Sequence, residues 1–334
     1  MVGTLVPKGM NRSADCQQRG WTASYVSDML YRAIIGPLVD GLRRAARTTR
    51  HGTRSAGTGG LGLALGGGFA RGFAHLGVLQ ALDDNKIPVS CIAGTSIGSI
   101  LGAAYASGVA PERIAAVCRR IHFRDFARWR ISRLGLASND RMGELIQRWF
   151  GTLSFEDMRI PFASVATDLC SGEPQVMTSG DLVAAIRASC AYPGLFEPVM
   201  VNGQCLADGG LVAQVPTEAA AAFGPRWVMG ISVEFKEWNG APPRNMFQVI
   251  SRAIGAAQKH RSPSWQSFAH VKVEPEVGEF EWDAFDRADE IIAAGAAAMR
   301  RALPHLRALM GLSEHKEQPA PMPLQASLPQ FSSD

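Results

Sequence analysis

Residues 61–106 decide the fold, and they read LGLALGGGFARGFAHLGVLQALDDNKIPVSCIAGTSIGSILGAAYA. Two glycine-rich turns interrupt this stretch, Gly66-Gly67-Gly68-Phe69-Ala70-Arg71-Gly72 and Gly94-Thr95-Ser96-Ile97-Gly98. Each turn follows a short apolar run and precedes a helical pattern of apolar residues. The alternation predicts an α/β fold in which a central, mainly parallel sheet is flanked by helices.

The two turns also indicate a chemistry. A glycine-rich turn at a helix N-terminus gathers backbone N–H groups, and these stabilise developing negative charge. A serine on a tight strand-to-helix bend, here Ser96 between Gly94 and Gly98, resembles the nucleophile elbow of α/β-hydrolase architecture. Together the turns predict acyl transfer through a serine nucleophile.

The rest of the chain continues the alternation. Expected strands are 162–166, 199–206 with a hairpin at Asn202-Gly203, 226–233 and 269–273. Expected helices are 140–150, 181–188, 217–223, 246–258 and 286–303, the last stopped or kinked by Pro304.

Composition predicts one main domain with two extensions. The chain has 334 residues, 46% of them hydrophobic, which suffices for a large core. We expect a basic arm at 1–57, a catalytic domain at 58–312 and a disordered, proline-containing tail at 313–334. Residues 87–111 carry no charge, but their glycines and Pro88 argue against a membrane span.

The six cysteines form no C-x-x-C pair, so we expect no disulfide framework and no structural metal. The sequence shows no N-terminal signal-peptide pattern. Both observations favour a cytoplasmic protein.

Two basic segments raise the question of a charged partner. The arm combines apolar residues at helical spacing with arginines from Arg43 to Arg54, which suits an amphipathic helix on the anionic inner surface of a membrane. Residues 119–134 interleave arginines with aromatic and aliphatic residues, as expected for a lid or an interfacial surface. In both segments a helix packed on the domain remains the alternative. A nucleic-acid arm is disfavoured, because no stacking platform or binding motif follows.

A nucleotide or phosphate ligand is a second alternative. Gly66, Gly68 and Gly72 are spaced G-x-G-x-x-x-G, one residue longer than the dinucleotide fingerprint, and no G-K-[ST] of a Walker A loop is present. The spacing therefore favours an oxyanion turn.

With Asp208-Gly209-Gly210, the two turns resemble the three signature blocks of the patatin-like phospholipase family, most closely its small bacterial members. The stretch 189–198, SCAYPGLFEP, resembles the segment that this family carries before its aspartate. The resemblance covers about residues 60–310. It implies hydrolysis of a phospholipid or another lipid ester, without a metal or an organic cofactor.

The resemblance also implies roles for single residues. Ser96 would be the nucleophile and Asp208 the base of a Ser-Asp dyad, with no histidine between them. Gly67, Gly68 and Phe69 would donate N–H groups to the oxyanion, and Arg71 would orient that loop or add positive charge. A serine needs such a positioned base to become nucleophilic.

Other interpretations stay open at this point. Ser96 could be a helix N-cap and Asp208 a turn residue. His270 could complete a conventional Ser-Asp-His triad, whereas His75 and Asp168 suit structural roles. The chain could also be a catalytically silent lipid-binding or regulatory protein.

Overall fold

The computed structural model describes residues 60–312, apart from 131, 151–153, 234–241 and 260–264. The expected arm and tail lie outside the described residues, and the extent of the catalytic domain remains a prediction. Within the described part, an eight-stranded sheet forms the centre, with strand order β10-β9-β1-β2-β5-β8-β7 and β6 paired to β5. The strands are β1 Leu61–Leu65, β2 Val89–Thr95, β5 Phe162–Asp168, β6 Pro174–Met177, β7 Val199–Val201, β8 Gln204–Asp208, β9 Trp227–Ile231 and β10 Val271–Val273.

The sheet is mainly parallel, as the sequence predicts. Strands β10, β9, β1, β2 and β5 run in one direction. Strands β6 and β8 pair with β5 in the antiparallel sense, and β7 pairs with β8 through the predicted hairpin, where Asn202 and Gly203 both have positive φ. Because β8 runs antiparallel to β5, its last residue, Asp208, lies beside Ala166 of β5.

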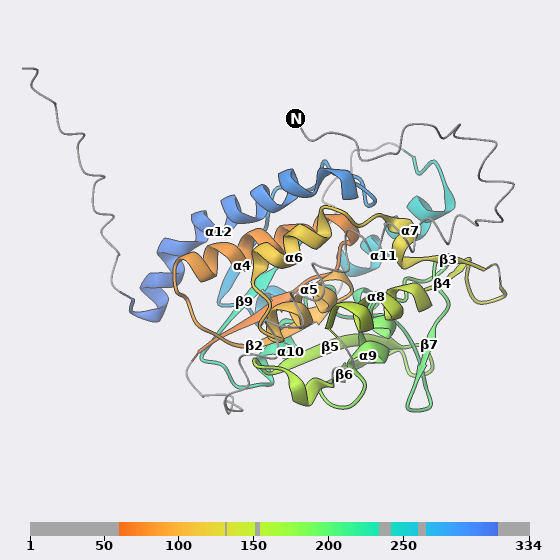
Figure 1. Ribbon diagram of the computed structural model, residues 1–334, viewed down its shortest axis with the longest axis horizontal. Coiled ribbons are helices and arrows are strands. Elements are labelled where there is room, and N and C mark those ends of the chain that lie inside the picture. Colours follow the sequence, from red (N-terminus) through yellow and green to blue (C-terminus); the bar gives the residue numbers. More distant parts are fainter. Residues whose placement is uncertain (1–59, 131, 151–153, 234–241, 260–264, 313–334) are drawn as a thin grey trace, which may run out of the picture.

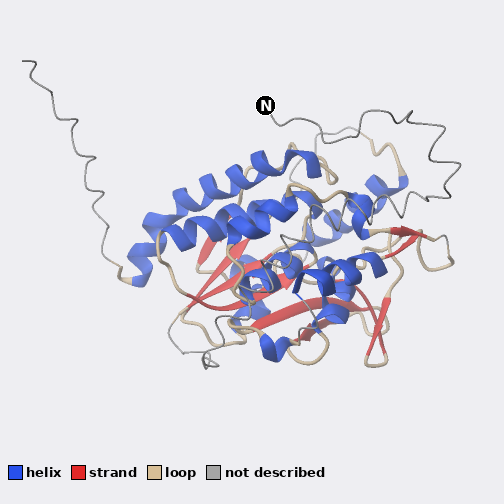
Figure 2. Ribbon diagram, in the orientation of Figure 1, coloured by secondary structure: helices blue, strands red, loops and turns tan. Residues whose placement is uncertain are grey.

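Helices cover both faces of the sheet (Figure 2). They are α4 Ala74–Asp84, α5 Ile97–Ala106, α6 Pro111–Cys118, α7 Phe123–Phe126, α8 Asp140–Phe150, α9 Leu182–Ser189, α10 Thr217–Ala221, α11 Met246–Lys259 and α12 Ala288–Met310. Figure 1 shows α12, α4 and α6 side by side. No helix in the described ranges is both long enough and apolar enough to cross a bilayer.

The central strands are buried on both faces, which explains why β1 is an unbroken apolar run. Its leucines, such as Leu63, enter a large core with α4, α5 and α12. Ala64 points the other way, into a smaller core that includes Ala219 and Ala220 of α10. The alternation of side chains along a strand therefore divides the interior into two unequal cores.

The structure corrects the expected stop at Pro304 and the alternative of a single helix at residues 119–134. Helix α12 continues through Pro304 to Met310, because Leu303 and Leu306 are buried in the core and hold the last turns. Pro304 removes one intrahelical hydrogen bond, and it is exposed, so water can satisfy the carbonyl group left over. Residues 119–134 do not form one amphipathic helix. They contain the single turn α7 and the short strand β3 Arg128–Trp129, which pairs with β4 Ala137–Ser138.

Candidate active site

Ser96 stands between β2 and α5 in a strained conformation. Its φ is 53° and its ψ is −123°, a region that a residue with a side chain occupies only where the surroundings enforce it. The flanking glycines make the bend possible. A Cβ atom at Gly98 would lie 2.2 Å from the carbonyl oxygen of Leu65, and one at Gly94 would lie 2.5 Å from that of Gly98. The chain therefore makes a tight strand-to-helix turn at Ser96.

The backbone of the elbow is held by a second serine. The Ser96 N–H donates to Ser189 Oγ at 2.8 Å, and the Ser189 hydroxyl donates to the Val165 carbonyl oxygen at 2.6 Å. Ser189 is fully buried and ends α9. We infer that Ser189 fixes the orientation of Ser96. The sequence places Ser189 at the start of the SCAYPG stretch, but no periodicity or spacing reveals this contact.

Asp208 reaches Ser96 through the register of the sheet. Thr95 pairs with Val165 in the parallel ladder, and Asp208 pairs with the next residue of β5, Ala166, in the antiparallel one. The ends of β2 and β8 therefore flank the same point of β5. The Thr167 hydroxyl donates to the Asp208 carbonyl oxygen at 2.8 Å and holds this turn in place.

The Asp208 carboxyl group is buried, with 4% of the residue exposed. Burial raises the pKa of Asp208 to about 6, while hydrogen bonds from the Gly210 N–H and the Ser96 side chain oppose the rise. The Gly210 N–H donates to Asp208 Oδ1 at 2.8 Å. A carboxylate that has left water and contacts a serine hydroxyl is a stronger base than an ordinary aspartate.

The glycine-rich turn lies beside the elbow. A Cβ atom at Gly67 would be 3.3 Å from Ser96 Cβ. Within the described part of the chain, the Gly68 N–H has no hydrogen-bond acceptor, and Phe69 follows with a positive φ of 51°. The buried Arg71 donates through Nε to the Gly68 carbonyl oxygen at 3.5 Å.

The N–H of Gly67, one of the predicted oxyanion donors, bonds within the protein. The Gly67 N–H donates to the Gln214 carbonyl oxygen at 3.0 Å, and the Gln214 side chain donates back to the Gly67 carbonyl oxygen at 2.9 Å. Both the N–H and the carbonyl group of Gly67 thus bond to Gln214, and this N–H is not directed at the cavity. No local pattern points to Gln214, because 147 positions separate it from Gly67.

An apolar cavity opens at Ser96. The space between its walls is about 390 Å³, open solvent included. Ser96 shares its wall with aromatic and aliphatic side chains, among them Phe69, Ile97, Ile100, Phe123, Phe126 and Phe196. The Cys190 thiol also lines the cavity, and burial raises its pKa well above the ordinary value. The site combines one hydroxyl and one carboxyl group with a largely apolar wall.

Among the described residues, neither His270 nor His75 completes this site as a conventional triad would require. His270 Nδ1 accepts the Val228 N–H at 3.1 Å, and Val228 is level with Gly62 and Cys91 in the ladder. Cys91 precedes Ser96 by five residues, about 16 Å along a strand. His270 therefore lies near the start of the parallel strands, whereas Ser96 lies at their carboxyl end. His75 is buried and donates through Nε2 to the Gly66 carbonyl oxygen at 2.8 Å, which is the expected structural role.

Two further expectations concern Asp168 and metals. Asp168 Oδ1 accepts the Cys170 N–H at 2.9 Å in an exposed turn, again a structural role. Within the described ranges, no group of three or more His, Cys, Asp or Glu side chains is arranged to hold a metal ion.

The fold and this site define an α/β protein with a serine elbow, a buried aspartate and a glycine-rich turn. Residues 63–221 match the family model described as "Patatin-like phospholipase". Over these residues the chain is similar to the patatin-like phospholipase family.

Three similar proteins illustrate this relationship. An uncharacterized NTE family protein of Mycobacterium tuberculosis is 35% identical over 178 residues, which are 52% of this chain and 49% of that protein. Lysophospholipase NTE1 of Mycosarcoma maydis is 34% identical over 52% of this chain and 10% of its own length. Patatin-like phospholipase domain-containing protein 6 of Mus musculus is 33% identical over 52% and 13%. The matched segment thus spans half or less of each of these relatives.

Among solved structures, VipD from Legionella pneumophila aligns over 74% of this chain and 67% of its own. The TM-score is 0.45 and the sequence identity 12%.

The raised pKa of Asp208 predicts a pH-dependent stability. Because the folded pKa exceeds the unfolded one, the folded state binds the proton more tightly, and stability falls as pH rises from about 4 to about 6. The side-chain amide in Asp208→Asn cannot ionise, so this variant does not lose stability over that pH range. Its melting temperature relative to the parent should therefore increase between pH 4 and pH 7, by an amount equivalent to roughly 3 kcal/mol.

Asp168→Asn is the matched control. The Asp168 carboxyl is exposed and hydrogen bonds lower its pKa, so this variant should show no relative gain as pH rises. Equal pH dependence in the parent and Asp208→Asn would contradict a buried, raised carboxyl group.

Proposed function

We propose that this protein is a serine-dependent carboxylic ester hydrolase that acts on lipid esters, of the phospholipase A or lysophospholipase type. The observation that carries the proposal is the contact between a strained, buried serine and a desolvated aspartate, Ser96 and Asp208, at the wall of an apolar cavity. Similarity to this family and relatives named lysophospholipase support a lipid substrate.

In the proposed reaction Asp208 accepts the proton of the Ser96 hydroxyl as Ser96 Oγ attacks the ester carbonyl carbon. The carbonyl oxygen becomes an oxyanion, for which we assign the N–H groups of Gly68 and Phe69 as donors. Asp208 then gives the proton to the departing alcohol, and the acyl group remains bonded to Ser96 Oγ. Water, deprotonated by Asp208, releases the fatty acid and restores both side chains.

The surroundings of Ser96 suit this reaction. Ser189 and the glycines of the elbow hold Oγ toward the cavity without a rearrangement during the reaction. Arg71 holds the Gly68 carbonyl oxygen, so the next N–H groups keep one orientation. The apolar wall accepts an acyl chain and keeps water away from the carboxylate, which strengthens its electrostatic interactions. A catalytically silent lipid-binding protein would not need the buried carboxyl group at the serine.

Substitution of the dyad tests the assignment. Ser96→Ala removes the nucleophile and Asp208→Asn the proton acceptor, so each should lower kcat for a short soluble ester by at least about 10³-fold. Ser107→Ala and Asp168→Asn are matched controls, because both residues lie outside the cavity and bond local backbone groups. These controls should keep near-parental kcat, and circular dichroism should show an intact fold in all four variants.

Two outcomes would overturn the dyad. Retained turnover in Ser96→Ala would exclude this serine as the nucleophile. A mild effect of Asp208→Asn together with a severe effect of His270→Ala would favour a triad.

We further propose that the enzyme works at the cytoplasmic face of a membrane, in peripheral contact with anionic lipid. Among the described residues of the β3–β4 segment, 128–138, two apolar side chains face solvent, Trp129 at 66% and Leu134 at 68% exposure. Arg130 and Arg133 are exposed beside them and form no ion pair within the described part of the chain. Apolar side chains among cations match the headgroup region of an anionic bilayer.

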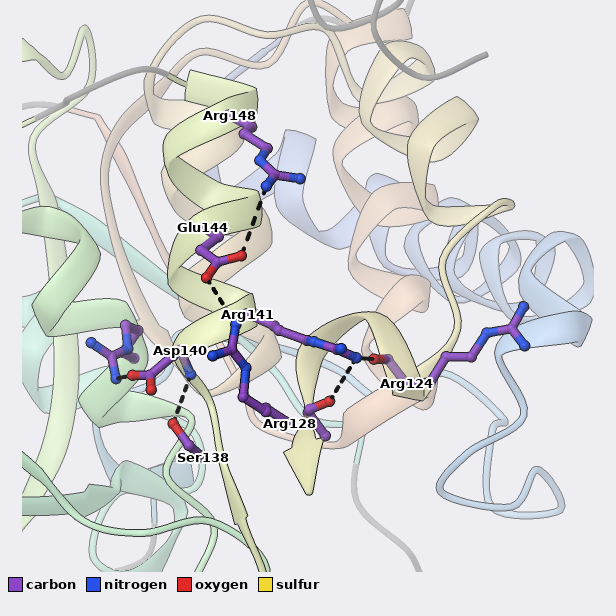
Figure 3. Close-up of polar contacts among 9 residues, drawn as sticks. Arg124, Arg128, Ser138, Asp140, Arg141, Glu144 and Arg148 are labelled. Atoms are coloured by element: carbon purple, nitrogen blue, oxygen red, sulfur yellow. Dashed lines mark hydrogen bonds and ion pairs between the residues drawn. The ribbon is translucent and has the colours of Figure 1, made fainter. Parts of the chain in front are cut away.

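This surface adjoins the cavity. The ring of Trp129 lies 6.5 Å from that of Phe123, which lines the cavity with Ser96. Figure 3 shows that α8 holds the start of this segment and the turn α7 before it. Arg141 of α8 donates to the carbonyl oxygens of Arg124 and Ala127. Glu144 of α8 forms ion pairs with Arg128 and Arg148. The Arg124 side chain points away from this network. A lipid could pass from the bilayer along Trp129 and Phe123 to the serine.

Vesicle binding tests the surface. Replacing both Arg130 and Arg133 by Gln should weaken binding to vesicles that contain phosphatidylglycerol by about 2 kcal/mol, roughly 30-fold, and the difference should shrink in high salt. Trp129→Ser should weaken binding to neutral and anionic vesicles alike. Leu169→Ser, which changes another exposed apolar residue, is the control, and all variants should hydrolyse a short soluble ester normally. Unchanged vesicle binding in both test variants would exclude this surface.

A further inference from the structure

A second cavity lies beyond the one at Ser96. The space between its walls is about 440 Å³, open solvent included, and the walls consist of hydrocarbon side chains and one thiol, Cys118. Helix α5 forms one side and α6 another, with Ile114 and Cys118 contributed by α6. Within the described part of the chain, no charged side chain lines this cavity, so an ionic or strongly hydrated ligand would not be stable there.

The two cavities share three residues, Ile97, Ile100 and Phe126. The wall is also continuous on the aromatic side. Phe285 lines the cavity at Ser96, and its ring centroid lies 5.6 Å from that of Phe73, which lines the second cavity. The two cavities therefore adjoin, with apolar side chains alone between them.

Helix α5 lines both cavities. Ile97, Ile100 and Ala104 are spaced three and four residues apart, so they lie on one face of the helix and point into the second cavity. Ala104 is eight residues after Ser96, about 12 Å along the helix axis. That distance and the apolar wall suit an extended hydrocarbon chain whose carboxyl end is at Ser96.

We propose that the second cavity binds the far end of a long acyl chain and selects substrates by chain length. The proposal rests on the proposed function, because Ser96 must carry the acyl group. Residues Ala104 and Cys118 stand where the chain would end, and Phe126 stands where it would pass from one cavity to the other. Short acyl chains would fill only the cavity at Ser96, and long ones would fill both.

Chain-length profiles provide the first test. Ala104→Leu and Cys118→Leu each add bulk to the second cavity from a different helix. Each should lower kcat/KM for a p-nitrophenyl palmitate by at least about tenfold, since a hydrophobic pocket discriminates single methylene groups by about that factor or more. The same variants should keep kcat/KM for the butyrate within about twofold. Ala302→Leu, a half-buried position on α12 outside both cavities, is the matched control and should preserve the parental profile.

A labelling experiment provides a second test that does not depend on steady-state rates. A long-chain alkyl fluorophosphonate with a photoreactive group at its far end should react at Ser96 and, after illumination, crosslink to peptides of α5 or α6. A short-chain fluorophosphonate should label Ser96 equally well in the parent and in Ala104→Leu. The long-chain reagent should label Ala104→Leu at least about tenfold more slowly.

The outcomes separate the two proposals. No reaction of either reagent at Ser96 would overturn the proposed function. Reaction at Ser96 with crosslinks elsewhere, or unchanged chain-length profiles in both leucine variants, would leave the hydrolase intact and overturn the second cavity as the acyl site.

Discussion

The close approach of α5 to the end of β1 is the constraint on which the site depends. The absence of a side chain at Gly98 lets the first turn of α5 lie against the Leu65 carbonyl oxygen, where a Cβ atom would be only 2.2 Å away. Because β1 and β2 are parallel neighbours, this contact puts the glycine-rich turn after β1 beside the serine after β2. A larger residue at Gly98 would separate the N–H donors from the nucleophile they are proposed to serve.

The buried aspartate is the second determinant of the chemistry. A carboxyl group removed from water ionises less readily, and in this site the Gly210 N–H and the Ser96 side chain limit the rise of its pKa to about 6. At neutral pH the carboxylate is ionised yet more basic than an exposed aspartate. The same burial that makes Asp208 a useful base lowers the stability of the fold above that pH, a conflict between activity and stability that is common at active sites.

Much of this arrangement follows from local sequence. Apolar runs, glycine turns and helical spacing predict the strands and helices around Ser96, because each signal is short-range. The contacts that refine the site are long-range and leave no such signal: Ser189 binds the backbone of Ser96, and Gln214 takes the N–H of Gly67. The secondary structure of residues 119–134 is likewise not determined by local sequence, because mixed arginines and aromatic residues fit a helix, a strand or a loop. Tertiary packing at Leu303 and Leu306 likewise overrides the helix-breaking tendency of Pro304.

The central claim is that the acyl group passes through Ser96. The most direct measurement is mass spectrometry of the protein quenched during turnover of a p-nitrophenyl ester, whose good leaving group lets acylation outpace deacylation. We expect one acyl group per chain, on the peptide that contains Ser96, with an added mass that follows the acyl chain supplied. Turnover with no acyl adduct, or with the adduct on another residue, would contradict the account.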